Sequence, residues 1–163
     1  MKDIKFVTKI VRFVLILIVF VLILIVFVTN KTVSAKEPLN IAVTYDTTTV
    51  KKDDLLKCRV SIRYNREGAA QMTIVDLGNP PGFELQTDAF ESLKERGVIE
   101  RYSLEGRQAI LYFREIRGNR PIEFEYRLKA KFPVRAKTPV STAYQYYEPE
   151  VRAEAAPVLL TIH

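Results

Sequence analysis

Residues 122–132 read IEFEYRLKAKF, and this stretch decides the fold class. Apolar side chains occupy every second position from Ile122 to Phe132, and Glu, Arg or Lys occupies every position between them. A period of two places the apolar side chains on one face of a strand and the charged ones on the other. The stretch therefore predicts a half-buried β-strand whose charged face meets water.

The same alternation continues outward along the chain. Residues 56–64 (LKCRVSIRY) repeat it and place Cys58 on the apolar face, where a small thiol serves packing. Turn-forming residues such as the Asn79-Pro80-Pro81-Gly82 corner separate the segments. About eight short strands with regular turns predict an all-β fold, an antiparallel β-sandwich. The further strands are expected at residues 40–45, 72–77, 99–104, 109–116, 140–147 and 158–162.

One short helix is expected to interrupt the strands after the Pro-Pro-Gly corner. Asp88 is expected to cap its start, with Glu91 completing a capping box, and Gly97 is suited to follow its last turn. Phe90 and Leu93 fall on one face of this helix. We therefore expect a crossover helix that lies against the sandwich.

The N-terminal segment has the order of an export signal. Four basic residues within 1–12 precede an unbroken apolar run at residues 13–28. The basic residues are expected to stay in the cytoplasm, which places the following domain outside it. We therefore divide the chain into a signal peptide or N-terminal signal anchor at residues 1–35 and a β-sandwich domain at residues 36–163. The domain is expected to be secreted or periplasmic, or anchored to the outer side of a membrane.

Cleavage and anchoring both remain open. Val33-Ser34-Ala35 offers small residues suited to signal peptidase. Against this, the apolar run is nearly long enough to complete a transmembrane helix of about 20 residues. Residues 14–20 (VLILIVF) recur unchanged as residues 21–27. Our hypothesis is that a local duplication lengthened a cleavable signal and turned it into an anchor.

Composition argues against an enzyme and against a nucleic-acid partner. Of the net charge of +6, +4 lies in residues 1–37, and basic and acidic residues alternate in the remainder. His163, the last residue, is the only histidine, and Cys58 is the only cysteine. No metal-ligand spacing, phosphate-binding glycine loop or nucleophile elbow occurs. We expect no catalytic residue, no metal, no cofactor and no small-molecule substrate.

An ordered set of short blocks resembles the receptor-binding domain at the C-terminal end of alpha-macroglobulins and thioester complement-like proteins. This resemblance covers essentially all of residues 39–163. The most telling block is YQYYEPE at residues 144–150. The other blocks are QMTIVDL (71–77), PPGF (80–83), IERY (99–102), AILYF (109–113), FEYRLKA (124–130) and PV (133–134).

The resemblance implies a β-sandwich that serves large protease-trapping proteins, so an endopeptidase-inhibitor system is the implied context. In animal relatives two lysines at the start of the helix bind a clearance receptor. The matching positions here are Thr87 and Glu91, so receptor-mediated clearance is not carried over. The sequence also contains no bait region and no Gly-Cys-Gly-Glu-Gln thioester motif. We therefore do not expect this chain to trap a protease covalently by itself.

The favoured function is an exported, non-catalytic protein-binding module. Its partner is expected to be a protein, such as a component of a macroglobulin or protease system, and the N-terminal segment contacts a membrane if uncleaved. A membrane-anchored structural or adhesion module unrelated to protease inhibition is the alternative, followed by a gene fragment and then an unrecognised hydrolase. Exposed tyrosine offers rigid contact area. The candidate protein-contact residues are Glu91, Lys94, Tyr144, Tyr146 and Tyr147.

Overall fold

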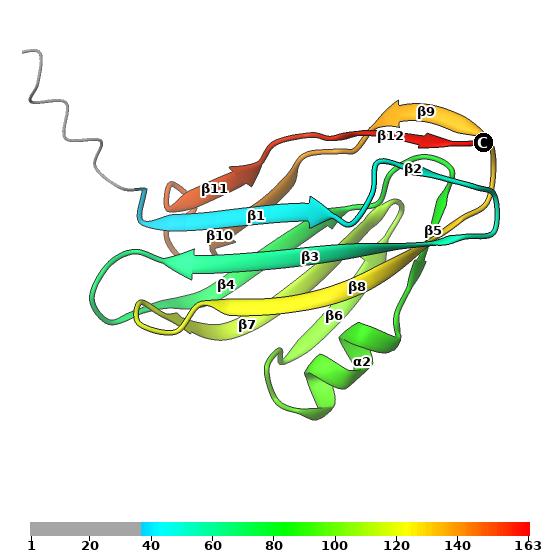
Figure 1. Ribbon diagram of the computed structural model, residues 1–163. Helices are drawn as coiled ribbons and strands as arrows, with labels where there is room; N and C mark the ends of the chain where they lie inside the picture. The colour runs from blue at the N-terminus through cyan, green and yellow to red at the C-terminus, as the bar shows by residue number, and fades with distance from the viewer. Residues whose placement is uncertain (1–36) are drawn as a thin grey trace, which may run out of the picture. The chain divides into compact units, whose positions relative to one another are not determined.

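Two antiparallel sheets face each other in the computed structural model, which describes residues 37–163 (Figure 1). The four-stranded sheet has the order β1 (Leu39–Tyr45), β3 (Leu55–Tyr64), β8 (Ile122–Ala130) and β5 (Phe83–Gln86). The five-stranded sheet has the order β11 (Arg152–Ala155), β10 (Ser141–Gln145), β4 (Ala69–Gly78), β7 (Gln108–Arg117) and β6 (Arg101–Glu105). The predicted all-β class and the β-sandwich are confirmed.

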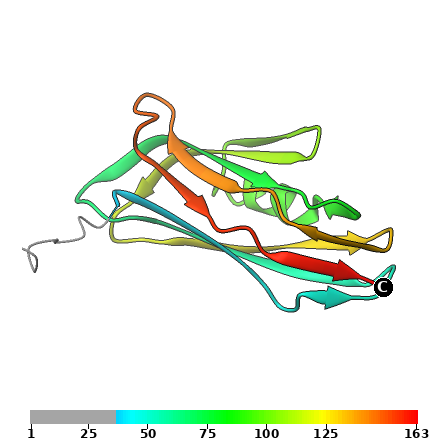
Figure 2. The ribbon, with the colours of Figure 1, turned by 90° about the horizontal axis from the view of Figure 1, so that it is seen from above.

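A third, small sheet extends the domain beyond the sandwich. It joins β2 (Thr49–Val50), β12 (Leu159–Ile162) and β9 (Val134–Lys137), and it lies at the end where the chain terminates (Figure 2). The pair formed by β2 and β12 is parallel, unlike the pairs within the two large sheets. Of its three strands the sequence predicted β12, at residues 158–162, but not β2 or β9, because strands of two and four residues are too short to show a clear period of two.

The core lies between the two large sheets. Phe124, Tyr126 and Leu128 of β8 point inward as the alternation predicted, and the charged residues between them stay on the outer face. The prediction for Phe132 is wrong, because its side chain is 68% exposed. β8 ends at Ala130, and the backbone N–H groups of the next two residues both donate to the carbonyl of Gly82. The chain turns at this point, so Phe132 lies beyond the strand and the alternation no longer determines which way its side chain faces.

The helix within the described residues is α2 (Asp88–Glu95), and it connects β5 of one sheet with β6 of the other. Phe90 and Leu93 are buried, as their spacing predicted. Gly97 follows the helix in the left-handed region, with φ at +69°. Its N–H donates to the carbonyl of Lys94, and the N–H of Val98 donates to that of Leu93, both at 2.9 Å. This is the Schellman arrangement of a helix C-terminus, so the prediction for Gly97 is confirmed.

The prediction that Asp88 caps the helix is wrong. Thr87 occupies the N-cap position without a side-chain cap bond, and Asp88 is the first helical residue. Its carboxylate instead forms an ion pair with Arg127 of β8 at 2.5 Å. The predicted capping box also fails, because the carboxylate of Glu91 accepts a hydrogen bond from the hydroxyl of Tyr102. Both acidic groups therefore tie the helix to neighbouring strands.

The N-terminal predictions lie outside the described residues. These comprise the signal or anchor at residues 1–35 with its apolar run, and the domain boundary before residue 36. Within residues 37–163, no helix is long and apolar enough to cross a membrane.

Cys58 is a free thiol on the buried face of β3, as predicted. Burial raises the pKa of this thiol from 9.0 to about 12, and burial likewise raises the pKa of nearby Tyr45 from 10.0 to about 12. A group whose pKa is higher in the folded protein holds its proton more tightly there than in the unfolded chain. The contribution of Cys58 to stability is therefore complete below pH 9 and is lost as the pH rises from 9 to about 12, and that of Tyr45 is complete below pH 10 and is lost as the pH rises from 10 to about 12.

We expect the free energy of unfolding to fall by about 1–2 kcal/mol between pH 8 and pH 10 because the unfolded chain releases the Cys58 proton first. Urea titrations at both pH values measure this loss. The variant Cys58→Ala should lose distinctly less over the same interval. An equal loss in both proteins would show that the thiol is not responsible.

Candidate functional site

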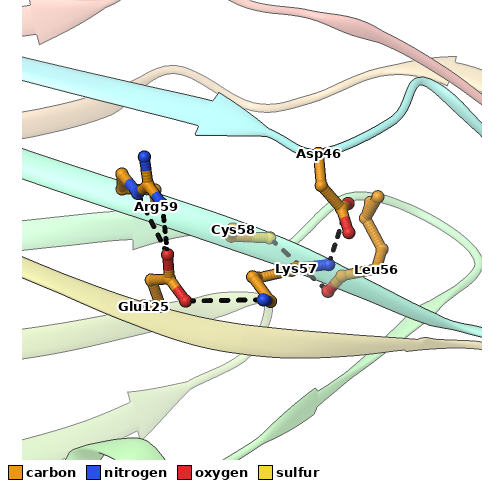
Figure 3. A network of polar contacts seen from close by, with 6 residues as sticks. All are labelled: Asp46, Leu56, Lys57, Cys58, Arg59 and Glu125. Atoms are coloured by element: carbon orange, nitrogen blue, oxygen red, sulfur yellow. Dashed lines mark hydrogen bonds and ion pairs between the residues drawn. The ribbon is translucent and has the colours of Figure 1, made fainter.

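The outer face of the four-stranded sheet is charged, and many of its charged side chains form ion pairs with neighbours on the sheet or close to it. Glu125 of β8 accepts hydrogen bonds from Arg59 at 2.7 and 3.0 Å and lies 3.7 Å from the ammonium group of Lys57 (Figure 3). Further pairs on the same strands and their neighbours join Arg63 to Glu123, Arg127 to Asp88 and Lys131 to Glu84. Exposed pairs of this kind contribute at most about 1 kcal/mol each. We therefore interpret this face as an ordinary solvent-exposed surface and not as a binding site.

The outer face of the five-stranded sheet is different, because aromatic and apolar side chains form a row across it. The strand register places Tyr144 of β10 opposite Ile74 of β4, Ile74 opposite Tyr112 of β7, and Tyr112 opposite Arg101 of β6. Their neighbours along the strands are buried in the core, so the row faces outward. Those neighbours are Ala143, Val75 and Leu111. Ile74 is only 7% exposed although it lies on an outer face, which indicates that large side chains cover it.

Met72 extends this row through an irregularity in β4. Its φ is +47°, in the left-handed region, and the inward-facing residues on either side of it, Ala70 and Thr73, are three positions apart instead of two. The buried Thr73 hydroxyl donates to the carbonyl of Ala70 at 3.2 Å, which stabilises the bend. The carbonyl of Met72 accepts the backbone N–H of Tyr146 at 2.9 Å. The bend thereby sets Tyr146 beside Met72 at the end of β10.

A pocket of about 300 Å³ lies on this face, and Tyr144 is the member of the row that does not line it. The guanidinium carbon of Arg101 lies 3.9 Å from the centre of the Tyr112 ring, a stacked cation–π contact. We call the surface made by Met72, Ile74, Arg101, Tyr112, Tyr144 and Tyr146 the tyrosine face. The pocket is lined by Met72, Thr73, Ile74, Glu100, Arg101, Tyr112, Phe113 and Tyr146.

The structure brings three of the five candidate contact residues together. Tyr144 belongs to the row, Tyr146 lines the pocket, and Tyr147 packs edge-on against Tyr146 with ring centres 5.1 Å apart. Partial burial, and then the charge of Asp76, raise the pKa of the Tyr144 hydroxyl above its ordinary value. Tyr146 and Tyr147 follow the end of β10, so their large exposure (59% and 73%) comes from the end of the strand and not from its alternation.

Glu91 and Lys94 belong to a different surface. Both lie on the exposed side of α2. Glu91 contacts Tyr102, which alternates with Arg101 along β6 and packs against Phe90 under the helix. The helix residues therefore do not join the tyrosine face.

The sequence predictions missed Met72, Ile74, Arg101 and Tyr112 as surface residues. The sequence did contain a signal for two of these four residues, Ile74 and Tyr112. The segments around Ile74 and Tyr112 are apolar in both phases of the alternation, which is typical of strands covered on both faces. The stacking of Arg101 carries no signal, because it depends on the pairing of β6 with β7.

Asp76 lies next to the row on the same face, in partly buried surroundings. Its Oδ2 accepts a hydrogen bond from Gln108 at 2.8 Å, while Oδ1 is buried without a partner. Burial, and then the charge of Glu105, raise the pKa of this carboxyl group. Within residues 37–163, no group of three or more His, Cys, Asp or Glu side chains could hold a metal ion.

Comparison with known proteins supports the resemblance inferred from sequence. A family model described as "A-macroglobulin receptor binding domain" matches residues 68–156, which is narrower than the expected 39–163 and leaves out β1 to β3 and β12. No curated protein matches the chain.

Several solved structures share the fold. Native alpha-2-macroglobulin from Escherichia coli, spanning domain MG7 to the C-terminus, superposes with a TM-score of 0.67 and 15% identity, over 79% of this chain and 24% of that one. The Y1175G mutant of Salmonella alpha-2-macroglobulin gives 0.66 and 16%, over 78% of this chain and 9% of that one. At these identities the likeness shows the fold alone. The chain spans about a quarter or less of the length of these proteins.

Proposed function

The chain belongs to the A-macroglobulin receptor-binding domain family, and on that premise we propose that it is a non-catalytic protein-binding module whose contact surface is the tyrosine face. Tyr147, which packs against Tyr146 beside this face, takes part in the same contact. Receptor binding through the helix is not part of the proposal, since the resemblance places Thr87 and Glu91 at the positions of the two receptor-binding lysines of animal relatives.

The observation that carries the proposal is the contrast between the two outer faces. The charged face of the four-stranded sheet pairs its own groups, as the contacts of Glu125 show. The tyrosine face instead presents Met72 and Tyr146 to solvent around a pocket. Tyrosine, with few rotatable bonds and a mixed apolar and polar side chain, is enriched at the centres of protein interfaces. Such a surface on a domain with no catalytic motif supports binding.

We propose that the domain acts outside the cytoplasm. The support is the order of basic and apolar residues before position 36, which directs the following domain across a membrane. N-terminal sequencing of the mature protein separates the two forms of this proposal: a start at Lys36 contradicts the anchored form. Protection of the domain from added protease in intact cells with a permeable outer layer would contradict export itself.

The test of the proposed function is a pull-down from native membranes with the full chain, read by mass spectrometry. We expect a specific protein partner whose affinity falls at least about tenfold for Tyr146→Ala, because truncating a tyrosine that is a hot spot of an interface costs about 2 kcal/mol or more. Glu154→Ala, an exposed change on β11 of the same sheet, serves as the matched control and should bind like the wild type.

A partner that binds Tyr146→Ala and the wild type equally would exclude the tyrosine face as the contact surface. Retention in the membrane fraction with no recovered partner would favour the structural or adhesion alternative.

A further inference from the structure

We propose that the pocket of the tyrosine face binds a segment of a partner protein in which a large apolar side chain stands next to a carboxylate. The apolar side chain fills the pocket, and the carboxylate binds Arg101. This inference rests on the proposed function, because it names the chemistry of the partner for the same surface.

The pocket suits an apolar group of limited size. Its volume of about 300 Å³ lies at the lower end of the range for ligand pockets. Ile74 and Tyr112 lie in the row that crosses it, and Met72 and Tyr146 stand at its edge with 38% and 59% of their surface exposed. Covering such side chains contributes about 25 cal/mol for each Å² of apolar surface removed from water. A leucine- or phenylalanine-sized side chain on a partner would provide this cover.

The charge at the pocket selects a carboxylate. Among the described residues that line it, Glu100 and Arg101 are charged. The Glu100 carboxylate is bonded to the Nε of Arg114 at 2.7 Å, so its charge is already compensated. Arg101 forms no ion pair with any carboxylate of residues 37–163. The uncompensated charge at the pocket is therefore positive.

The geometry of Arg101 adds specificity to this charge. Stacking on Tyr112 at 3.9 Å holds the guanidinium group at the pocket before a partner arrives. A guanidinium group fixed in this way keeps its N–H donors at the edge of the plane, where they can bind both oxygens of a carboxylate. Little side-chain entropy remains to be lost on binding. A lysine at this position would keep the positive charge but lose the planar group that stacks on Tyr112 and presents two N–H donors to one carboxylate.

The test uses the full chain in detergent micelles, held by a tag placed after His163, and random twelve-residue peptides displayed on phage as the probe. Selection is carried out on the wild type, and the selected peptides are then measured on variants. We expect them to share an Asp or Glu beside a large apolar residue. Their affinity should fall at least about tenfold on Arg101→Gln, since hydrogen bonds between charged groups are the stronger ones. Arg101→Lys should give an intermediate loss.

Arg107→Gln is the matched control, because Arg107 is an exposed arginine on the turn between β6 and β7 that does not line the pocket. It should bind the peptides like the wild type. Replacing the peptide's Asp with Asn should lower affinity on the wild type and cause no further loss on Arg101→Gln. This double-mutant cycle separates a direct contact from a general effect of charge.

Three results would overturn the inference, and they are distinguishable from a failure of the proposed function. The inference is overturned if the selected peptides lack a carboxylate, or if they bind Arg101→Gln as tightly as the wild type. The tyrosine face remains the proposed contact surface in that case if Tyr146→Ala abolishes the binding of these peptides. Peptides indifferent to both variants overturn the inference and count against the tyrosine face as well. A selection that yields no binder overturns the inference alone, because the membrane pull-down decides the proposed function independently.

Discussion

Replacing Phe90 with alanine is expected to lower the free energy of unfolding by about 3–5 kcal/mol. The ring is fully buried on the inner side of α2. It contacts the rings of Tyr126 and Phe124 in the four-stranded sheet, with centres 5.5 and 6.4 Å apart, and that of Tyr102 in the five-stranded sheet at 5.6 Å. Phe90 thus joins both sheets at the edge where the helix crosses between them. Its removal leaves a cavity that neither sheet can close without moving.

The same substitution should also loosen the helix. A helix of eight residues is not stable by itself in water, so α2 depends on the side chains that anchor it. Urea denaturation of the full chain in detergent micelles, followed by circular dichroism, measures the loss. Glu95→Ala, at an exposed position of the same helix, should change stability by less than about 0.5 kcal/mol. A loss below 1 kcal/mol for Phe90→Ala would mean that the helix packs on the sheets without supporting them.

Replacing Gly118 with alanine is expected to lower the free energy of unfolding by about 3 kcal/mol. A Cβ at this position would lie 1.9 Å from the carbonyl oxygen of Arg66, closer than two such atoms can approach. The backbone N–H of Gly118 also donates to the carbonyl of Gly68 at 3.0 Å. These contacts hold the turn between β7 and β8 against the turn between β3 and β4. The obstacle is backbone, so no side-chain rotation can relieve the clash.

Gly106→Ala is the control that separates a steric effect from a conformational one. Gly106 has φ at +59°, in the left-handed region, and nothing lies within 4 Å of an added Cβ. Its cost should therefore be about 1 kcal/mol, the ordinary penalty for alanine in that conformation. Thermal or urea unfolding of both variants checks the difference. Equal losses would show that the turn at Gly118 moves freely and that the two turns are not held together.

The sequence predicted the long strands because their alternation is a local property. Residues 122–130 and 56–64 carry the pattern over nine residues or more, and their inward and outward faces are as expected. Asp88 and Phe132 were predicted wrongly for a common reason. In each case the local signal was correct, but a partner distant in the sequence, Arg127 or Gly82, gave the residue another contact.

Only part of the candidate site could be predicted from the sequence. Tyr144, Tyr146 and Tyr147 were predicted as contact residues from their residue type, because exposed tyrosine is typical of protein contact surfaces. Glu91 and Lys94 were grouped with them because a sequence does not show which surfaces adjoin. Met72 was not expected, because its left-handed backbone reverses which residues of β4 face outward. No local sequence pattern predicts a left-handed backbone conformation at a residue other than glycine, so the change in the outward face of β4 could not be foreseen.

The sequence by itself determined the all-β class, the inward faces of the long strands, the helix with its glycine terminus and the family. Each of these rests on the spacing of residues close together in the chain. Only the tertiary structure decided that residues from four strands meet in one row and that a pocket opens between Met72 and Tyr146. The physical reason is that strand order and register set which side chains become neighbours across a sheet. The stacking of Arg101 on Tyr112, on which the binding chemistry depends, exists only through that register.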